Sequence, residues 1–468
     1  MPRSRARVRY TAVRGVDRQL SVNKKTTYVG IGLVVLCLAY PGFAWLIGLR
    51  VEAALLKREQ QAMDQSHGTV TLISRQYHRG VYGATEELTY GLGAAGLRAL
   101  APLAGISDVA ALHLIVRNTI HHGPLPQFRT VGLATFTTKI ELPTQLSVKL
   151  RALLGGEPAI QIRGRLGWFG GETTVIASPG FEAHLADGSR ISWRELKATS
   201  SSNGNLSSIS IDWTLAGFEI KSAKAHMQLE ALQAQADLKR VFEGLYTGPF
   251  SMKIAAVKWQ PQSSSSQTLI RGLTISGTGS ADGDYYNSAM QFAADAVQTS
   301  GFSITHAGYA ISFEHLHGPT LAAMMKSAGS QPPAAAAAQT MTQNFTELLL
   351  HEPVLNITHI GFAMPEGEMG LSAKASVPGL KREDLDGPQL QPALMQHLNV
   401  VADLRIDAAL VMRLLASSGR KDALAAQIDA LEHQGYIKRD GKAWTAHVAL
   451  TGGKLTVNGQ PYPPPRGR

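Results

Sequence analysis

Runs of alternating apolar and polar residues constrain this chain more than any other feature. Each run is rich in β-branched and aromatic residues and is separated from the next by Gly, Ser, Asn or Asp, which is typical of antiparallel strands. The clearest runs cover residues 68–90, 111–123, 129–142, 158–171, 171–193, 207–230 and 301–318. The sequence therefore predicts a mainly β protein with some α: a long, curved antiparallel sheet with a few covering helices.

Helical patterns are few by comparison. Helix formers dominate residues 51–65, an apolar helical run covers 341–350, and residues 407–437 are helical with a break at Ser417-Ser418-Gly419. Two helical regions are little cover for so many strands, so the sheet is expected to curl and leave an apolar groove for a bound molecule. One wall of this groove is assigned to Phe302, Ile304, Tyr309, Ile311 and Phe313.

A 24-residue segment without charge, Thr26–Leu49, predicts one membrane-spanning helix. At 1.5 Å per residue it covers a hydrocarbon core of about 30 Å. Basic residues crowd its N-terminal side, so the positive-inside rule places the N-terminus in the cytoplasm and the rest of the chain in the periplasm. The alternative is a cleaved signal peptide with Gly42-Phe43-Ala44 as its cleavage site, although a signal h-region has only roughly 7–15 residues.

Charge and cysteine usage exclude several classes of protein. The first 25 residues hold eight basic residues and one acidic residue, and so +7 of the net charge of +10. The remaining chain is nearly balanced, which argues against a nucleic-acid partner. Cys37 is the single cysteine, so the chain forms neither an internal disulfide nor a thiolate metal cluster. No motif for a cofactor or a phosphate loop is present.

The expected layout places a single transmembrane helix before the sheet. It consists of a basic cytoplasmic tail (1–25), the transmembrane helix (26–49), a helical stalk (50–65), a periplasmic β-rich region (66–460) and a proline-rich tail (461–468). The β-rich region is open to division into two sub-units near residues 320–345. Near the C-terminus, a hairpin is predicted across Gly452-Gly453, with Val448 and Leu450 opposite Leu455 and Val457.

Three short stretches in this order, YHRGVY (77–82), IHHGPLP (120–126) and GGKLTVNGQPY (452–462), are similar to the YdgA-like family of bacterial envelope proteins, a domain of unknown function (DUF945). The late strand pair around Pro365-Glu366-Gly367 also resembles this family. The family commonly has Asp before the His-Gly-Pro, where this chain has His121. The resemblance implies a protein anchored in the inner membrane of Gram-negative bacteria, with no assigned reaction.

The candidate binding residues are His78, Arg79, His121 and His122, because imidazole and guanidinium groups capture anions. Neighbouring histidines on a strand point to opposite faces, so His121 and His122 are not expected to share a metal. No metal site and no catalytic residue is predicted. For the YHRGVY stretch the sequence favours a structural role over anion capture: a bulge or bend in which Gly80 takes a backbone conformation that other residues resist. The structural residues are assigned as Tyr77, Gly80, Gly123, Pro124, Asn458 and Gly459.

Three functions remain open from the sequence. The first is a non-enzymatic periplasmic protein, tethered to the inner membrane, that binds an envelope lipid or a protein partner along its sheet. The second is an envelope hydrolase built around His78, His113, His121 and His122. The third is a structural protein that forms homo-oligomers through sheet edges.

Overall fold

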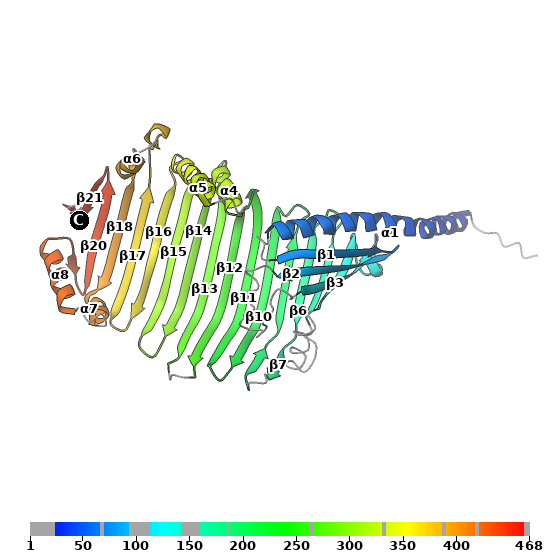
Figure 1. The fold of residues 1–468 in the computed structure, drawn as a ribbon, viewed down its shortest axis with the longest axis horizontal. Helices are drawn as coiled ribbons and strands as arrows, with labels where there is room; N and C mark the ends of the chain where they lie inside the picture. Colours follow the sequence, from blue (N-terminus) through cyan, green and yellow to red (C-terminus); the bar gives the residue numbers. More distant parts are fainter. Residues whose placement is uncertain are drawn as a thin grey trace, which may run out of the picture.

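The computed structural model describes residues 24–65, 70–92, 113–141, 160–184, 188–262, 266–329, 334–385, 390–416 and 421–462. These residues form one 22-stranded sheet and six α-helices, so the mainly β antiparallel architecture is confirmed (Figure 1). Within the described part of the chain, no helix is both long and apolar enough to cross a membrane.

The strands follow one another along the sheet almost in chain order. The first group is β1 (Val70–Arg79), β2 (Gly83–Leu92), β3 (His113–His122), β4 (Ala134–Glu141), β5 (Gln161–Leu166), β6 (Glu172–Ser178), β7 (Phe181–His184), β8 (Arg190–Trp193) and β9 (Leu196–Ser202). Each of β1 to β5 pairs with the next strand, and β9 then joins β6 to β10. The hairpin of β7 and β8 pairs with the other end of β10.

Long strands make up the centre of the sheet. They are β10 (Ser208–Lys221), β11 (Ala225–Phe242), β12 (Leu245–Pro261), β13 (Thr268–Asp282), β14 (Tyr285–Gln298), β15 (Ser303–His317), β16 (Val354–Met364), β17 (Gly367–Ser376) and β18 (Asn399–Asp407). The last strands are β19 (Lys438–Asp440), β20 (Ala443–Thr451), β21 (Lys454–Val457) and β22 (Gln460–Pro461). Because β15 pairs directly with β16, the sheet continues across residues 320–345.

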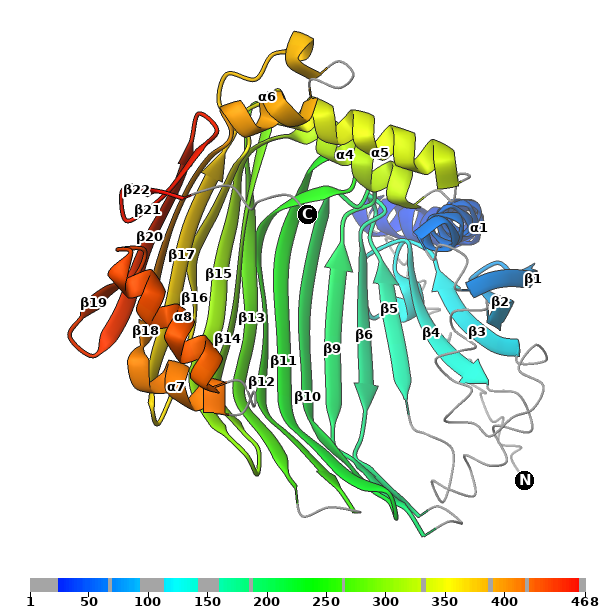
Figure 2. The same cartoon turned by 60° about the vertical axis from the view of Figure 1, so that its left-hand side comes forward.

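Helices lie at the margins of the sheet (Figure 2). They are α1 (Lys24–Gln65), α4 (Gly318–Gly329), α5 (Ala334–Leu349), α6 (Leu390–His397), α7 (Ala408–Ala416) and α8 (Lys421–His433), with short 3-10 turns η2 (Pro126–Phe128) and η3 (Arg382–Leu385). The break expected at residues 417–419 lies outside the described residues. Helix α4 contacts β11 and β15, and α7 contacts β17 and β18. The middle of the long strands is therefore bare of helices in Figure 2.

The register of the strands puts their apolar side chains on one continuous face. One cross-strand row, in order from β5 to β20, contains Ile162, Ile176, Ala198, Trp213, Ala234, Met252, Ile275, Phe292, Tyr309, Ile360, Leu371, Leu404 and Ala446. We call the face that carries this row the apolar face. Since successive side chains of a strand point to opposite sides, the other face is polar, with the row Asp212, Gln235, Ser251, Ser276 and Gln291.

The apolar face is exposed in its central part. Its exposed large side chains include Trp213, Met227, Phe250, Trp259, Met290 and Phe313. Of the side chains assigned to the expected groove wall, Ile304, Tyr309 and Ile311 lie in β15 opposite Val297, Phe292 and Met290 of β14. Phe302 precedes the strand. Continuous exposed apolar surface of this kind is uncommon on a protein without a partner for it.

Candidate functional site

The N-terminal helix covers one end of the apolar face, and the two sequence motifs YHRGVY and IHHGPLP lie beneath it. Helix α1 lies along β1 to β3 in Figure 1 and contacts β1 and β3. Ile47 and Val51 of α1 are buried together with Ala84, Ile120 and Leu166 of the sheet. We call this contact region the helix seat.

His122, the second histidine of the IHHGPLP motif, is at the centre of the helix seat. It is 2 % exposed, and its Nδ1 lies 3.0 Å from the backbone carbonyl oxygen of Ala44. Gly48 makes room for the imidazole, because a Cβ there would lie 2.6 Å from His122 Cε1. Gly123 has a φ of +136°, and a Cβ there would lie 3.5 Å from both Tyr40 Oη and Ala44 Cβ. The motif therefore lets helix and strand approach closely.

The pKa of His122 is lowered, chiefly because burial disfavours the charged imidazolium. The hydrogen bond to Ala44 opposes this effect, and the neighbouring charges of Arg79 and His121 reinforce it. At neutral pH a neutral imidazole thus donates from Nδ1 to the helix backbone. Among the described residues, its Nε2 has no hydrogen-bond partner. In the part of the chain that the structure describes, no carboxylate is paired with this imidazole.

The YHRGVY stretch contains the turn between β1 and β2. The backbone N–H of Gly80 donates to the carbonyl of Gly83 at 2.8 Å, which closes a hairpin. The expected bend is therefore a hairpin turn. The prediction of a special backbone conformation at Gly80 is wrong, because the φ of Gly80 is not positive. In the IHHGPLP motif, Gly123 does have a positive φ.

Side chains of the same stretch divide between the two faces. Arg79 Nη1 donates to Glu52 Oε2 of α1 at 3.0 Å, and its guanidinium lies 5.2 Å from the ring centre of Trp45. Tyr77 also faces the helix seat, where burial first and then the charges of Glu52 and Glu86 raise the pKa of its hydroxyl to about 12. His78 is exposed on the other face, and among the described residues it has no polar partner.

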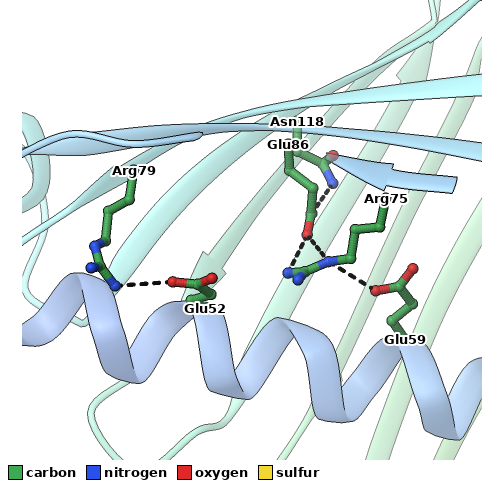
Figure 3. Close-up of polar contacts among 6 residues, drawn as sticks. All are labelled: Glu52, Glu59, Arg75, Arg79, Glu86 and Asn118. Atoms are coloured by element: carbon green, nitrogen blue, oxygen red, sulfur yellow. Dashed lines mark hydrogen bonds and ion pairs between the residues drawn. The ribbon is translucent and has the colours of Figure 1, made fainter. Parts of the chain in front are cut away.

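A buried polar network extends the helix seat toward the end of α1 (Figure 3). Arg75 donates to Glu86 Oε1 from Nη2 at 2.8 Å and from Nε at 3.0 Å, and Asn118 Nδ2 donates to Glu86 Oε2 at 2.8 Å. Glu59 Oε2 of α1 lies 3.1 Å from Arg75 Nε, without the alignment of a hydrogen bond. One guanidinium thus faces two carboxylates, and burial is the main cause that raises the pKa of Glu59.

The structure brings together only part of the expected site. Arg79, His122 and Gly123 converge on α1, whereas His78 and His121 do not. Asn458 and Gly459 form a separate two-residue turn between β21 and β22, with φ values of 51° and 82°. Sequence reasoning missed the helix partners of the motifs, and its one available signal was the pair of small residues Ala44 and Gly48, one turn apart on a helix.

The histidines of the alternative hydrolase site do not converge on one point. Across the described residues, no three His, Cys, Asp or Glu side chains are placed to hold a metal ion. His113 is at the start of β3 and His122 at its end, so the strand itself keeps them apart. The helix seat is suited to holding a helix against a sheet.

The sheet and the helix seat define the class of this protein: one open antiparallel sheet with an apolar face, fastened at one end to an N-terminal helix. The family model of a bacterial protein of unknown function (DUF945) matches residues 23–465, and the chain belongs to this family. No curated protein and no solved structure matches it.

Proposed function

We propose that this protein is a non-enzymatic, membrane-anchored periplasmic protein that binds acyl chains of envelope lipids on its apolar face. The observation that carries the proposal is the unbroken apolar row from β5 to β20, of which Trp213 and Met252 are central members. Each CH₂ group that such a face removes from water contributes about 0.8 kcal/mol. An acyl chain laid across several strands would gain several times this amount.

Lipid suits the apolar face better than an extended peptide does. The central strands are hydrogen-bonded to neighbours on both sides, so no backbone group is free there to pair with an added strand. An extended peptide lying across them would have to leave its own amide groups without partners, which is costly. An acyl chain has no such groups.

The anchor is proposed from the sequence of α1. The segment Thr26–Leu49 has no charge and follows eight basic residues, which favours a single span of the inner membrane with a cytoplasmic N-terminus. Helix α1 continues without interruption to Gln65, through the helix seat. A sheet held in this way would keep one end of its apolar face beside the membrane.

Two neighbouring residues of β14 test the proposal, because they point to opposite faces. Met290 is 42 % exposed on the apolar face, and Gln291 follows it on the polar face. The readout is photo-crosslinking of a diazirine-bearing phospholipid to strands β12–β15 of the full-length protein, located by peptide mapping so that crosslinks to α1 are counted apart. We expect Met290→Glu to abolish the crosslinks to these strands, because the acyl chain would meet a charge. The matched variant Gln291→Glu is expected to keep the wild-type yield there. Equal labelling of these strands in the three proteins, or none in the wild type, overturns the proposal.

A further inference from the structure

Two loops beside α1 present exposed aromatic and aliphatic side chains at the same level of the helix. The β1–β2 turn contributes Val81 and Tyr82, and the β3–β4 loop contributes Leu125, Phe128 and Val131. The side chain of Phe128 is 78 % exposed, which is a high exposed fraction for a large aromatic residue. We call these five side chains the loop patch.

The loop patch is held to α1 by one tyrosine. The ring of Tyr40 stacks on Tyr82 at 6.0 Å and on Phe128 at 5.7 Å between centres. Its hydroxyl donates to the carbonyl of Leu125 at 3.3 Å. These contacts fix the position of the loop patch along α1, beside Tyr40.

Backbone strain accompanies the exposure of Phe128. Gln127 and Phe128 have φ values of 53° and 54°, in the left-handed region that residues other than glycine seldom adopt. Such conformations persist where the surroundings impose them, and they cluster at functional sites. In this loop the strained conformation turns a large aromatic side chain outward.

The length of the uncharged segment sets the depth at which Tyr40, and with it the loop patch, would lie in a bilayer. A span needs about 20 residues, which counted from Thr26 ends near Trp45. Tyr40 lies within that count, and the neighbouring side chains Phe43 and Leu46 of α1 are exposed as well. A helix inserted to this depth carries the loop patch into the membrane with it.

The charges near the loop patch agree with a lipid surface. Neither loop has an acidic residue, and the longer one carries an exposed Arg129. Aromatic rings beside a basic residue are favoured at the headgroup region of anionic membranes. We propose that the loop patch inserts into the periplasmic leaflet beside α1, so that the sheet rests on the bilayer with its N-terminal edge. This inference rests on the membrane anchor proposed above.

The inference is tested by the depth of single labels in the full-length protein, reconstituted in vesicles of phosphatidylethanolamine and phosphatidylglycerol. With Cys37→Ser as background, an environment-sensitive fluorophore is attached to Phe128→Cys. We expect strong quenching by doxyl-labelled lipid and weak quenching by iodide in water. A label at Phe169→Cys, on a residue that is 98 % exposed in the β5–β6 turn, is expected to show the reverse. That turn contacts Arg58, 18 residues beyond Tyr40 on α1.

The native Cys37 separates the two possible failures. If a label at Cys37 is quenched by lipid and the label at Phe128→Cys is quenched by iodide, the loop patch lies in water and the inference is overturned while the anchor stands. If neither label is quenched by lipid, the anchor fails too. Protection of the Phe128→Cys label from both quenchers means that a protein covers the patch, a second copy included, which also overturns the inference. Unchanged thermal melts of the labelled variants confirm that they are folded.

Discussion

Gly48 lies where helix α1 packs closely against the sheet, over His122. Its missing side chain leaves room for the His122 imidazole, whose Nδ1 in turn donates to the carbonyl of Ala44 one turn earlier. Glycine inside a helix costs roughly 1 kcal/mol relative to alanine, so its presence here needs a packing reason. The histidine supplies that reason.

We expect Gly48→Ala to destabilise the full-length protein by about 1–3 kcal/mol, the range for overpacking, since the new Cβ would lie 2.6 Å from His122 Cε1. Gly42→Ala is the matched control, because a Cβ there meets nothing within 4 Å. This control is expected to be neutral or slightly stabilising through helix propensity. Thermal melts in detergent compare the two variants. Equal melting temperatures would show that the imidazole moves aside at no cost.

At the scale of elements, α1 is joined to β1–β3 by charge as well as by apolar packing. Arg79 pairs with Glu52, and Arg75 is shared between Glu59 and the buried Glu86. Removing one partner of a buried pair is costly because the other charge is left uncompensated. The network therefore fixes the position of the helix along the strands, where apolar contacts alone allow sliding.

The raised pKa of Glu59 predicts a pH dependence of the helix seat. A carboxyl whose pKa is higher in the folded than in the unfolded protein adds stability that is complete below the unfolded pKa and is lost as the pH rises through the folded pKa. Glu59→Gln should mimic the protonated group at every pH. As the pH rises from below the unfolded pKa of the carboxyl to neutrality, we expect the melting temperature of the variant to rise relative to that of the wild type. Thermal melts at a series of pH values measure this difference. A constant difference between the two proteins contradicts the assignment.

On the scale of the whole molecule, the sheet is a single open layer whose apolar face is covered at one end and exposed in the middle. At the first end, α1 buries Ile120 and Leu166. In the middle, Trp213 and Phe250 remain exposed on the same face. Helix α1 of the chain itself covers the first end. For the exposed part of the apolar face, the proposed function is to bind lipid.

Truncation of α1 tests how far this end of the sheet depends on the helix. A chain that begins at Val51 lacks Ala44 and Ile47, which lie in the helix seat, whereas a chain that begins at Tyr40 keeps them. We expect amide hydrogen exchange in β2–β4 to be faster in the shorter chain, because these strands lose the part of α1 that buries them. Exchange in β12–β15 serves as the internal control and should be the same in both. Equal protection of β2–β4 would mean that residues 40–50 of α1 contribute no stability to these strands.

The sequence by itself determined the features that depend on neighbouring residues. The period of two along the strands predicted the antiparallel sheet, and Gly452-Gly453 predicted the hairpin, in which Val448 pairs with Val457 and Leu450 with Leu455. Pro461, by contrast, was expected to lie in a tail but ends β22. Helix α4 was also not expected.

Only the tertiary structure decided what the motifs do. His122 and Ala44 are 78 residues apart, and Arg79 and Glu52 are 27 apart, so neither pair leaves a local pattern in the sequence. In and beside the two motifs, positive φ values occur at Gly123, Gln127 and Phe128 rather than at Gly80, which the sequence alone did not indicate. A local pattern fixes which residues can form a strand, but the packing of distant segments fixes which of their side chains meet.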